Sequence, residues 1–327
     1  MAHLSVLDLS PIAAGSTAAQ SFRNSLSLAQ HAENWDYRRY WLAEHHGMPG
    51  IASAATAVLI AHIAGGTKRI RVGAGGIMLP NHAPLVIAEQ FGTLESLFPG
   101  RIDLGLGRAP GSDQRTARAL RRNLNSDADE FPQDVAELLA YFADDARLSV
   151  RAVPGQGLAV PVWILGSSLF GAQLAAEFGL PYAFASHFAP QQMMAAIELY
   201  RTRFQASAYL AKPYVMLGFN VFAAETDEQA QFHATSAQQA FLNLRSGRPG
   251  PLPPPVAGFM QQLGQAERGL LEQILACSAI GSAATVEKQM QNFIDSTGAD
   301  ELMITSNIFD HAMRLRSYEI VSQLSLR

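Results

Sequence analysis

Residues 38–47 read as a buried strand that ends in groups able to transfer protons. Positions 40–43 are aromatic or apolar, and Glu44, His45 and His46 follow directly. Histidine has an ordinary pKa near neutrality, and barrel enzymes carry their acid–base groups at strand ends. Adjacent strand residues point in opposite directions, so we expect at most one of the two histidines to face a pocket. The alternative is a surface loop with two solvated histidines.

Two glycines stand near the end of a second strand-like run. Residues 72–80 read Val-Gly-Ala-Gly-Gly-Ile-Met-Leu-Pro, with Gly75 and Gly76 adjacent. Glycine weakens a strand, and its usual compensation is that another group approaches the backbone closely. A flat ring lying across a barrel mouth would need this clearance. Tight packing between a helix and the strand is the alternative.

Two further segments could bind an anion. Arg108 follows a strand and precedes a Pro-Gly turn, and its planar guanidinium suits a phosphate or carboxylate. A salt bridge to a loop acid is the alternative. Ser167 and Ser168 open a helix near Phe170, where free N–H groups and hydroxyls can receive an anion. Ordinary N-capping by either serine is the alternative there.

These groups need a frame that brings distant strand ends together. Strand-like runs alternate with helix-like runs along the whole chain, which predicts a parallel sheet in an α/β fold. We expect eight strands, over residues 4–9, 40–43, 70–77, 102–106, 160–165, 181–185, 214–223 and 301–305. Eight is the number that closes a TIM (β/α)8 barrel. A doubly wound sheet is the alternative, but the turn after the first strand does not match GxGxxG.

Several helix boundaries can be read from capping residues. Ser16 or Thr17 is expected to cap the first helix, and Ser53 a helix that reaches about residue 64. Pro84 stands at the favoured first position of a further helix. The helix over 51–64 is apolar on nearly every side, which favours a homodimer that covers it. Burial under an insertion is the alternative.

Two segments exceed the needs of a barrel. Residues 109–159 form an insertion after the fourth strand, with a second helix expected over about 132–143. Its first part is expected to be a basic helix that carries Arg115, Arg118, Arg121 and Arg122. Residues 245–255, rich in proline and glycine, follow the seventh strand and are expected to be a mobile lid. A plain linker is the alternative.

Composition limits the class of protein. The 327 residues fit one barrel domain over 1–327, and 48% hydrophobic residues suffice for a large core. A net charge of −4 gives no case for nucleic-acid binding. Cys277 is the single cysteine, so neither a disulfide nor a thiolate metal site is expected, and HExxH is absent. Without a signal peptide or an apolar stretch of membrane-spanning length, we expect a cytoplasmic protein without a membrane segment.

The quoted motifs together resemble the bacterial luciferase-like flavin-dependent monooxygenases. The resemblance lies in Tyr-Trp-Leu-Ala-Glu-His-His at 40–46, in Gly-Ala-Gly-Gly-Ile-Met-Leu-Pro at 73–80, and in two later segments. These are Pro-Gly-Arg-Ile-Asp-Leu-Gly-Leu-Gly-Arg at 99–108 and Leu-Gly-Ser-Ser at 165–168. The resemblance covers nearly the whole chain. It is specific for the family and does not specify a substrate.

The resemblance implies a barrel that binds reduced FMN at its C-terminal edge and forms a peroxyflavin with O2. It implies that His45 is the active-site base, that a cis peptide joins Gly75 and Gly76 beside the flavin, and that Arg108, Ser167 and Ser168 hold the phosphate. A separate flavin reductase, acting transiently, would supply the reduced FMN. The substrate would be a small organic molecule.

Asp8, at the end of the first strand, and His187, after the sixth, are further candidates for the pocket. Three other functions stay open. One is a deazaflavin- or flavin-dependent dehydrogenase of the same superfamily, and another is a non-catalytic FMN-binding protein. The third is a phosphosugar-handling barrel that uses Arg108 and the serine turn for the phosphate of its substrate.

Overall fold

The chain folds as a closed parallel barrel. The computed structural model describes residues 2–109, 116, 119–120, 130–144 and 149–326. Eight strands form the ring, because β1 pairs with β2 and β9, β6 pairs with β7, and β7 pairs with β9. The ring strands are β1 (His3–Asp8), β2 (Arg39–Leu42), β3 (Arg71–Met78), β4 (Ile102–Gly107), β5 (Val162–Gly166), β6 (Tyr182–Phe184), β7 (Val215–Ala223) and β9 (Glu301–Thr305).

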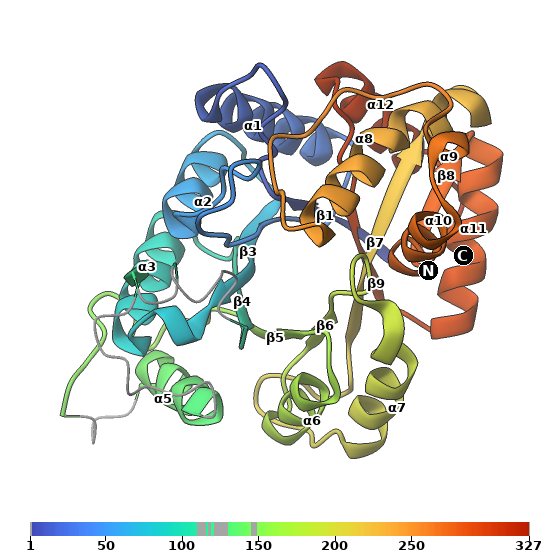
Figure 1. Ribbon diagram of the computed structural model, residues 1–327. Coiled ribbons are helices and arrows are strands. Elements are labelled where there is room, and N and C mark those ends of the chain that lie inside the picture. Colours follow the sequence, from blue (N-terminus) through green and yellow to red (C-terminus); the bar gives the residue numbers. More distant parts are fainter. Residues whose placement is uncertain (1, 110–115, 117–118, 121–129, 145–148, 327) are drawn as a thin grey trace.

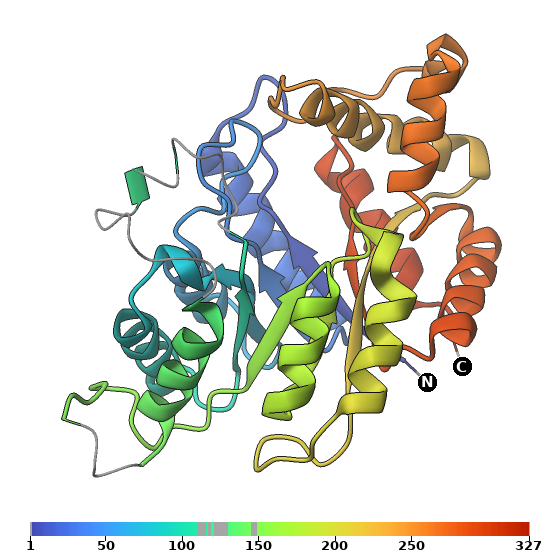
Figure 2. The ribbon, with the colours of Figure 1, turned by 60° about the horizontal axis from the view of Figure 1, so that its bottom comes forward.

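Helices surround this ring, as Figure 1 shows. Figure 2, turned from the first view, shows α6 and α7 side by side along the outside of the strands. The helices are α1 (Ala18–Asn34), α2 (Thr56–Gly65), η1 (Leu79–Asn81), α3 (Pro84–Leu97), α5 (Phe131–Phe142), α6 (Leu169–Phe178), η3 (Pro190–Gln192), α7 (Met193–Arg203), α8 (Asp227–Arg245), α9 (Phe259–Gln262), α10 (Gln265–Ile274), α11 (Ala283–Thr297) and α12 (His311–Ser322). Within the described ranges, no helix is both long and apolar enough to cross a membrane.

The capping predictions have different outcomes. Thr17 caps α1, since its side chain accepts a hydrogen bond from Gln20 N at 3.2 Å, and Pro84 begins α3. The prediction for Ser53 is wrong. Its hydroxyl donates to the carbonyl of Leu9 at 3.0 Å, so α2 begins only at Thr56 with no side-chain cap.

A ninth strand, β8 (Ser278–Gly281), was not expected from the sequence. It pairs with residues 220–223 of β7, whereas β6 pairs with residues 215–217. Because β9 occupies the opposite edge of β7, β6 and β8 share one edge in succession. Four residues give too short an alternation to be recognised in a sequence.

The proline-rich segment (246–258) lies between the loop after β1 and helix α8, and Figure 2 shows it beside that loop. Leu252 N donates to Ile12 O, and Ala14 N donates to Leu252 O, both at 2.8 Å. Farther along, Val256 N donates to the hydroxyl of Thr235 in α8 at 2.9 Å. The segment is thus fastened at two places, and its mobility stays a prediction. The predicted basic helix at Arg115–Arg122 falls largely outside the described residues.

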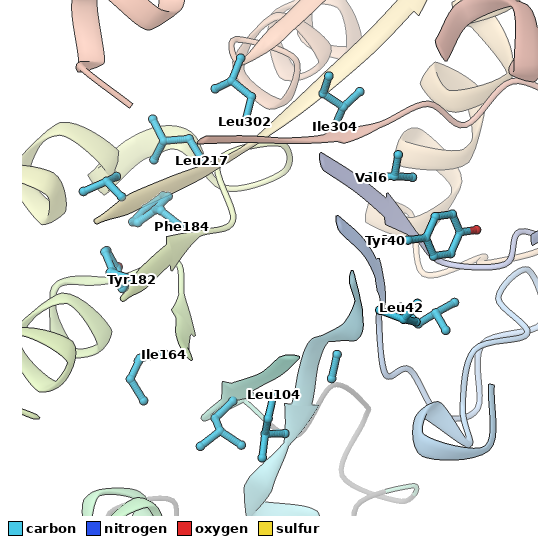
Figure 3. Packing of buried hydrophobic residues seen from close by; sticks show 14 of the residues in the cluster. Val6, Tyr40, Leu42, Leu104, Ile164, Tyr182, Phe184, Leu217, Leu302 and Ile304 are labelled. Carbon is cyan, nitrogen blue, oxygen red and sulfur yellow. The ribbon is translucent and has the colours of Figure 1, made fainter. Parts of the chain in front are cut away.

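Strand alternation divides the core into two parts. Outward residues of the strands pack under the helices, and Figure 3 labels ten of them. Inward residues fill the barrel, namely Leu7, Trp41, Ala43, Trp163, Ala183, Met216 and Met303. The barrel interior is therefore a packed core at mid-height.

A charged cluster closes the N-terminal end of the barrel. Arg39 contacts Asp103 and Glu301, each at 2.8 Å, and Arg71 contacts Asp103 at 2.6 Å. Tyr214 donates to Glu301 at 2.8 Å. Burial lowers the pKa of Arg39, but the two carboxylates outweigh burial and hold that pKa above its ordinary value. We call Arg39, Arg71, Asp103 and Glu301 the charged plug.

We expect Glu301→Ala to destabilise the fold by roughly 3–5 kcal/mol, because it leaves Arg39 in a dry site with half its partners. The matched control is Glu319→Ala, which removes a surface partner of Arg316 and should cost less than about 1 kcal/mol. Denaturant unfolding measures both. Equal losses in the two variants would show that the plug adds no more than a surface pair.

Candidate active site

Glu44 ties the ends of two strands together. It is buried after β2, and its Oε1 is 2.8 Å from His46 Nε2 and 2.9 Å from His82 Nε2. Its Oε2 accepts from Met78 N at 3.0 Å, at the end of β3. Burial raises the pKa of Glu44, but the hydrogen bonds from His82, His46 and Met78 outweigh it and hold the pKa below its ordinary value. His46 is therefore the histidine that bonds a neighbour.

His45 lies near His187, which follows β6. Burial, and then the charge of His45, lower the pKa of His187 to about 4. His187 Nδ1 is buried and has no hydrogen-bond partner among the described residues. A Cβ at position 218 would lie 2.2 Å from this nitrogen, so Gly218 makes room for the ring. Two residues predicted separately from the sequence thus come together.

The loop that carries His187 lies beside the point on β7 where pairing with β6 ends and pairing with β8 begins. Asn220, the residue of β7 at that point, donates to His187 O at 2.7 Å and to Ser278 Oγ at 3.2 Å. Its amide therefore joins the His187 loop to the start of β8. Neither Asn220 nor Gly218 was predicted, because their role depends on the unexpected strand.

The peptide bond between Gly75 and Gly76 is cis, as the resemblance implies. A Cβ at Gly75 would lie 3.1 Å from Trp41 Cε3, and one at Gly76 would lie 2.7 Å from the carbonyl oxygen of Gly105. Neighbouring strands and the Trp41 ring thus account for both glycines. The close packing here is between strands, and it is not the packing of a helix on the strand that the sequence left as the alternative. Contact with a flavin stays a prediction.

Arg108 reaches the N-terminus of α6. Its guanidinium lies 4.2 Å from the ring centroid of Phe170, in the first turn of that helix. No hydrogen bond or ion pair links Arg108 to any residue that the structure describes, so the predicted salt bridge to a loop acid is not seen there. Ser168 is the N-cap, yet its side chain makes no capping bond, and the first turn holds no acidic residue. The guanidinium of Arg108, the N-terminus of α6 and the hydroxyl of Ser168 therefore lie at one place. Ser167, the preceding residue, is exposed.

Asp8 does not lie with these groups, and its assignment to the pocket is corrected. It follows the inward-facing Leu7, so its side chain points outward between strands and helices. Arg314 contacts it at 2.8 Å, Ser10 N donates to it, and the hydroxyls of Ser25 and Tyr40 also donate. Burial raises the pKa of Asp8, but Arg314 and the hydroxyls outweigh burial, so the carboxylate is a structural anion.

Within the described ranges, no three or more His, Cys, Asp or Glu side chains are grouped so as to hold a metal ion. The C-terminal ends of β2, β4, β5 and β6 thus carry two histidines, a guanidinium and a helix N-terminus.

The chain belongs to the luciferase-like monooxygenase family, whose model matches residues 2–301. A luciferase-like monooxygenase of Escherichia coli K12 is 55% identical over 317 residues, which cover 97% of this chain and 95% of that protein. An N-acetyl-S-alkylcysteine monooxygenase of Bacillus subtilis is 35% identical over 256 residues, or 76% and 75% of the two chains. The crystal structure of apo-MsnO8 has 34% identity and a TM-score of 0.92, with 100% of both chains covered.

More distant structures share the fold. The oxygenating constituent of 3,6-diketocamphane monooxygenase of Pseudomonas putida, in complex with FMN, has a TM-score of 0.73 at 18% identity, with 99% and 97% of the chains covered. An F420-dependent secondary alcohol dehydrogenase has the same TM-score at 13% identity, with 97% of each chain covered. The TIM-barrel prediction is therefore confirmed.

The placement of His187 predicts a pH-dependent stability. Its ring resists protonation in the fold but takes a proton at about pH 6.5 when unfolded, so stability falls as the pH drops from 6.5 towards 4. The shift corresponds to roughly 3 kcal/mol. We expect His187→Asn to lose this contribution, measured as the free energy of unfolding at a series of pH values.

His62→Asn, at an exposed position of α2, is the matched control. Burial also lowers the pKa of His311 to about 4, and that contribution is common to all three proteins. If the two variants showed the same slope between pH 4 and 6.5, the burial of a neutral His187 would be refuted.

Proposed function

We propose that this chain is a flavin-dependent monooxygenase that uses reduced FMN and O2 to oxygenate a small organic substrate. The observation that carries the proposal is Arg108 beside the uncapped N-terminus of α6. A phosphate fits there, because guanidinium forks and helix N-termini both bind anions. The family and the FMN complex among structures of this fold support FMN as the ligand.

The residues of the site have separable tasks in this proposal. Reduced FMN, when bound, supplies the electrons that activate O2. Arg108, Ser167 and Ser168 hold its phosphate, and Gly75 and Gly76 line the place of the ring. His45 acts as the acid–base group at the reacting centre. The lowered pKa of His187 keeps its ring neutral near pH 7, so it can donate or accept a hydrogen bond beside His45 without adding a charge there.

Two further parts of the proposal concern supply and protection. A separate reductase delivers the reduced FMN transiently. The proline-rich segment limits the entry of water from the side of the loop after β1. The cytoplasm is the proposed location.

A deazaflavin-dependent dehydrogenase is the second candidate. It is favoured by the F420-dependent alcohol dehydrogenase, which shares the fold. In that case, the same barrel edge would hold a deazaflavin, and hydride transfer would replace oxygen activation. Cofactor choice in a binding titration separates the two.

Anaerobic titration with reduced FMN tests the proposal. We expect saturable binding, and Arg108→Ala should weaken it roughly 10- to 100-fold, the effect of losing a hydrogen bond to a charged group. Riboflavin, which lacks the phosphate, should bind wild type and Arg108→Ala equally. His45→Ala should bind reduced FMN normally in the anaerobic titration. When the complex is then mixed with O2, this variant should show a changed time course of flavin absorbance.

Arg203→Ala, an exposed arginine at the end of α7, is the matched control and should bind like the wild type. Equal loss of FMN and riboflavin in Arg108→Ala would place the phosphate elsewhere. Binding of a deazaflavin in preference to FMN would select the dehydrogenase. Binding of oxidised FMN without any effect of O2 would select a flavin carrier, and binding of neither flavin would select a phosphorylated substrate.

We also propose a homodimer that covers α2 and the neighbouring face of α3. Val58 of α2 is 69% exposed, and Val86 and Leu97 of α3 are exposed as well. Isolated apolar side chains are normal on a surface, but these three lie on two helices that contact each other, which favours a covered face. Val58→Glu should therefore shift the protein to monomers in sedimentation equilibrium. Val153→Glu, at an exposed valine in another part of the chain, should not, and a monomeric wild type would refute the proposal.

A further inference from the structure

Three aromatic side chains form a continuous series through the interior of the barrel. The ring centroids of Trp41 and Trp163 are 5.3 Å apart, and those of Trp163 and Tyr214 are 5.6 Å apart. Both pairs are edge-to-face, with interplanar angles of 85° and 84°. Edge-to-face contact at such distances is an arrangement that aromatic pairs favour, and it leaves no atom between neighbouring rings across which an electron would have to pass.

The series runs from the middle of the barrel to its N-terminal end. At one end, Trp41 packs under Gly75, where a Cβ would lie 3.1 Å from its ring. At the other, Tyr214 stands just before the first residue of β7 and is half-buried. Its hydroxyl also lies 3.3 Å from the exposed Arg38. The path therefore leads from the proposed cofactor site to the N-terminal face.

Cations lie over all three rings, with Arg39 also 5.9 Å from the ring centroid of Trp41 and Arg38 5.8 Å from that of Tyr214. The carboxylates that accept from Trp41 and Tyr214 therefore distinguish the two end rings from the middle one. Trp41 Nε1 donates to Asp103 at 3.2 Å, and this carboxylate stabilises a positive ring. Arg39 lies 4.8 Å over the ring of Trp163, and its positive charge disfavours a second one there. Trp163 Nε1 is buried and has no hydrogen-bond partner within the described residues, so an oxidised Trp163 has no acceptor for its proton.

Tyr214 is the natural end of the path, because it has a proton acceptor. Its hydroxyl donates to Glu301 Oε2 at 2.8 Å. Burial and Glu301 raise the pKa of Tyr214, so the phenol is protonated at rest. When an electron leaves this ring, the phenolic proton can pass to Glu301, and a neutral tyrosyl radical remains.

We propose that Trp41, Trp163 and Tyr214 carry one-electron oxidising equivalents away from the cofactor site to the N-terminal face. The inference rests on the proposed function, because bound oxidised FMN that has absorbed light is the one-electron oxidant that starts the process. Trp41 would give one electron to this flavin, Trp163 would then reduce Trp41, and Tyr214 would reduce Trp163. The net change is one electron lost by Tyr214 and one proton gained by Glu301. A thiol or ascorbate at the surface then returns the electron, and Glu301 returns the proton.

The path gives the barrel a protective activity apart from oxygenation. Trp41 is 1% exposed and packs against Gly75, so it is placed to be the first side chain that a light-excited flavin at the proposed site would oxidise. An oxidised tryptophan held there would be lost to irreversible reaction with O2. A tyrosyl radical at the opposite face is within reach of a soluble reductant.

The test uses the complex with oxidised FMN, after binding has been measured by titration. A light pulse excites the bound flavin, which then acts as the one-electron oxidant, and transient absorption follows the protein radicals. We expect a tyrosyl signal in the wild type. Tyr214→Phe should leave a tryptophan radical and no tyrosyl signal, and Trp163→Phe should abolish the tyrosyl signal while leaving Tyr214 in place.

Matched controls are Tyr209→Phe, at an exposed tyrosine, and Trp35→Phe, at the end of α1, and both should behave as the wild type. A second arm needs no flavin, because an ultraviolet pulse removes an electron from tryptophan directly. Failure to bind FMN would count against the proposed function, and the ultraviolet arm would then decide the path. A tyrosyl signal that persists in Tyr214→Phe, or is absent from the wild type in the ultraviolet arm, would overturn the inference.

Discussion

The two-sided contact of Arg39 with Asp103 and Glu301 is the interaction on which the barrel depends. Arg39 begins β2, Asp103 lies in β4 and Glu301 begins β9, so one guanidinium joins strands on three sides of the ring. Arg71 of β3 binds the second oxygen of Asp103. Because two cations face two anions in a dry place, each ion has partners for its charge, and the geometry is fixed by the fork of each guanidinium. The rings of Trp41 and Trp163 pack directly on this charged plug.

The C-terminal end of the barrel is held by a different set of contacts. Trp41 packs against Gly75 inside the barrel, and the carbonyl group of Gly105 in β4 lies against Gly76. The backbone at these two glycines is therefore restricted on both sides. Glu44 fixes the end of β3 from the other side through Met78 N. His45, between the anchored Glu44 and the anchored His46, therefore projects from a chain that is held on both sides. A rigid support of this kind is what an acid–base group requires.

Much of the fold could be predicted from the sequence, because each ring strand is bounded by turn residues and rich in apolar side chains. His45, Arg108 and the serine turn could be predicted because they follow such strands directly. The direction of Asp8 could not, since a shift of one residue in a strand exchanges inside for outside. Nor could His82 or Arg314, because their partners Glu44 and Asp8 lie 38 and 306 residues away in the chain. The place of His187 after β6 could be predicted. Its contact with Asn220 could not, because Asn220 pairs with β8, which is too short to be recognised in the sequence.

The succession of β6 and β8 along one edge of β7 has a consequence for how such a protein can change over time. Residues 224–300, which hold α8 to α11 and β8, leave the ring after β7 and return to it as β9. The hydrogen bonds that close the ring are made by other strands. Insertions and deletions in this excursion can therefore accumulate without opening the barrel, provided that the four residues of β8 keep their pairing. This excursion is therefore a part of the chain that can diverge separately from the strand ends that carry His45 and Arg108.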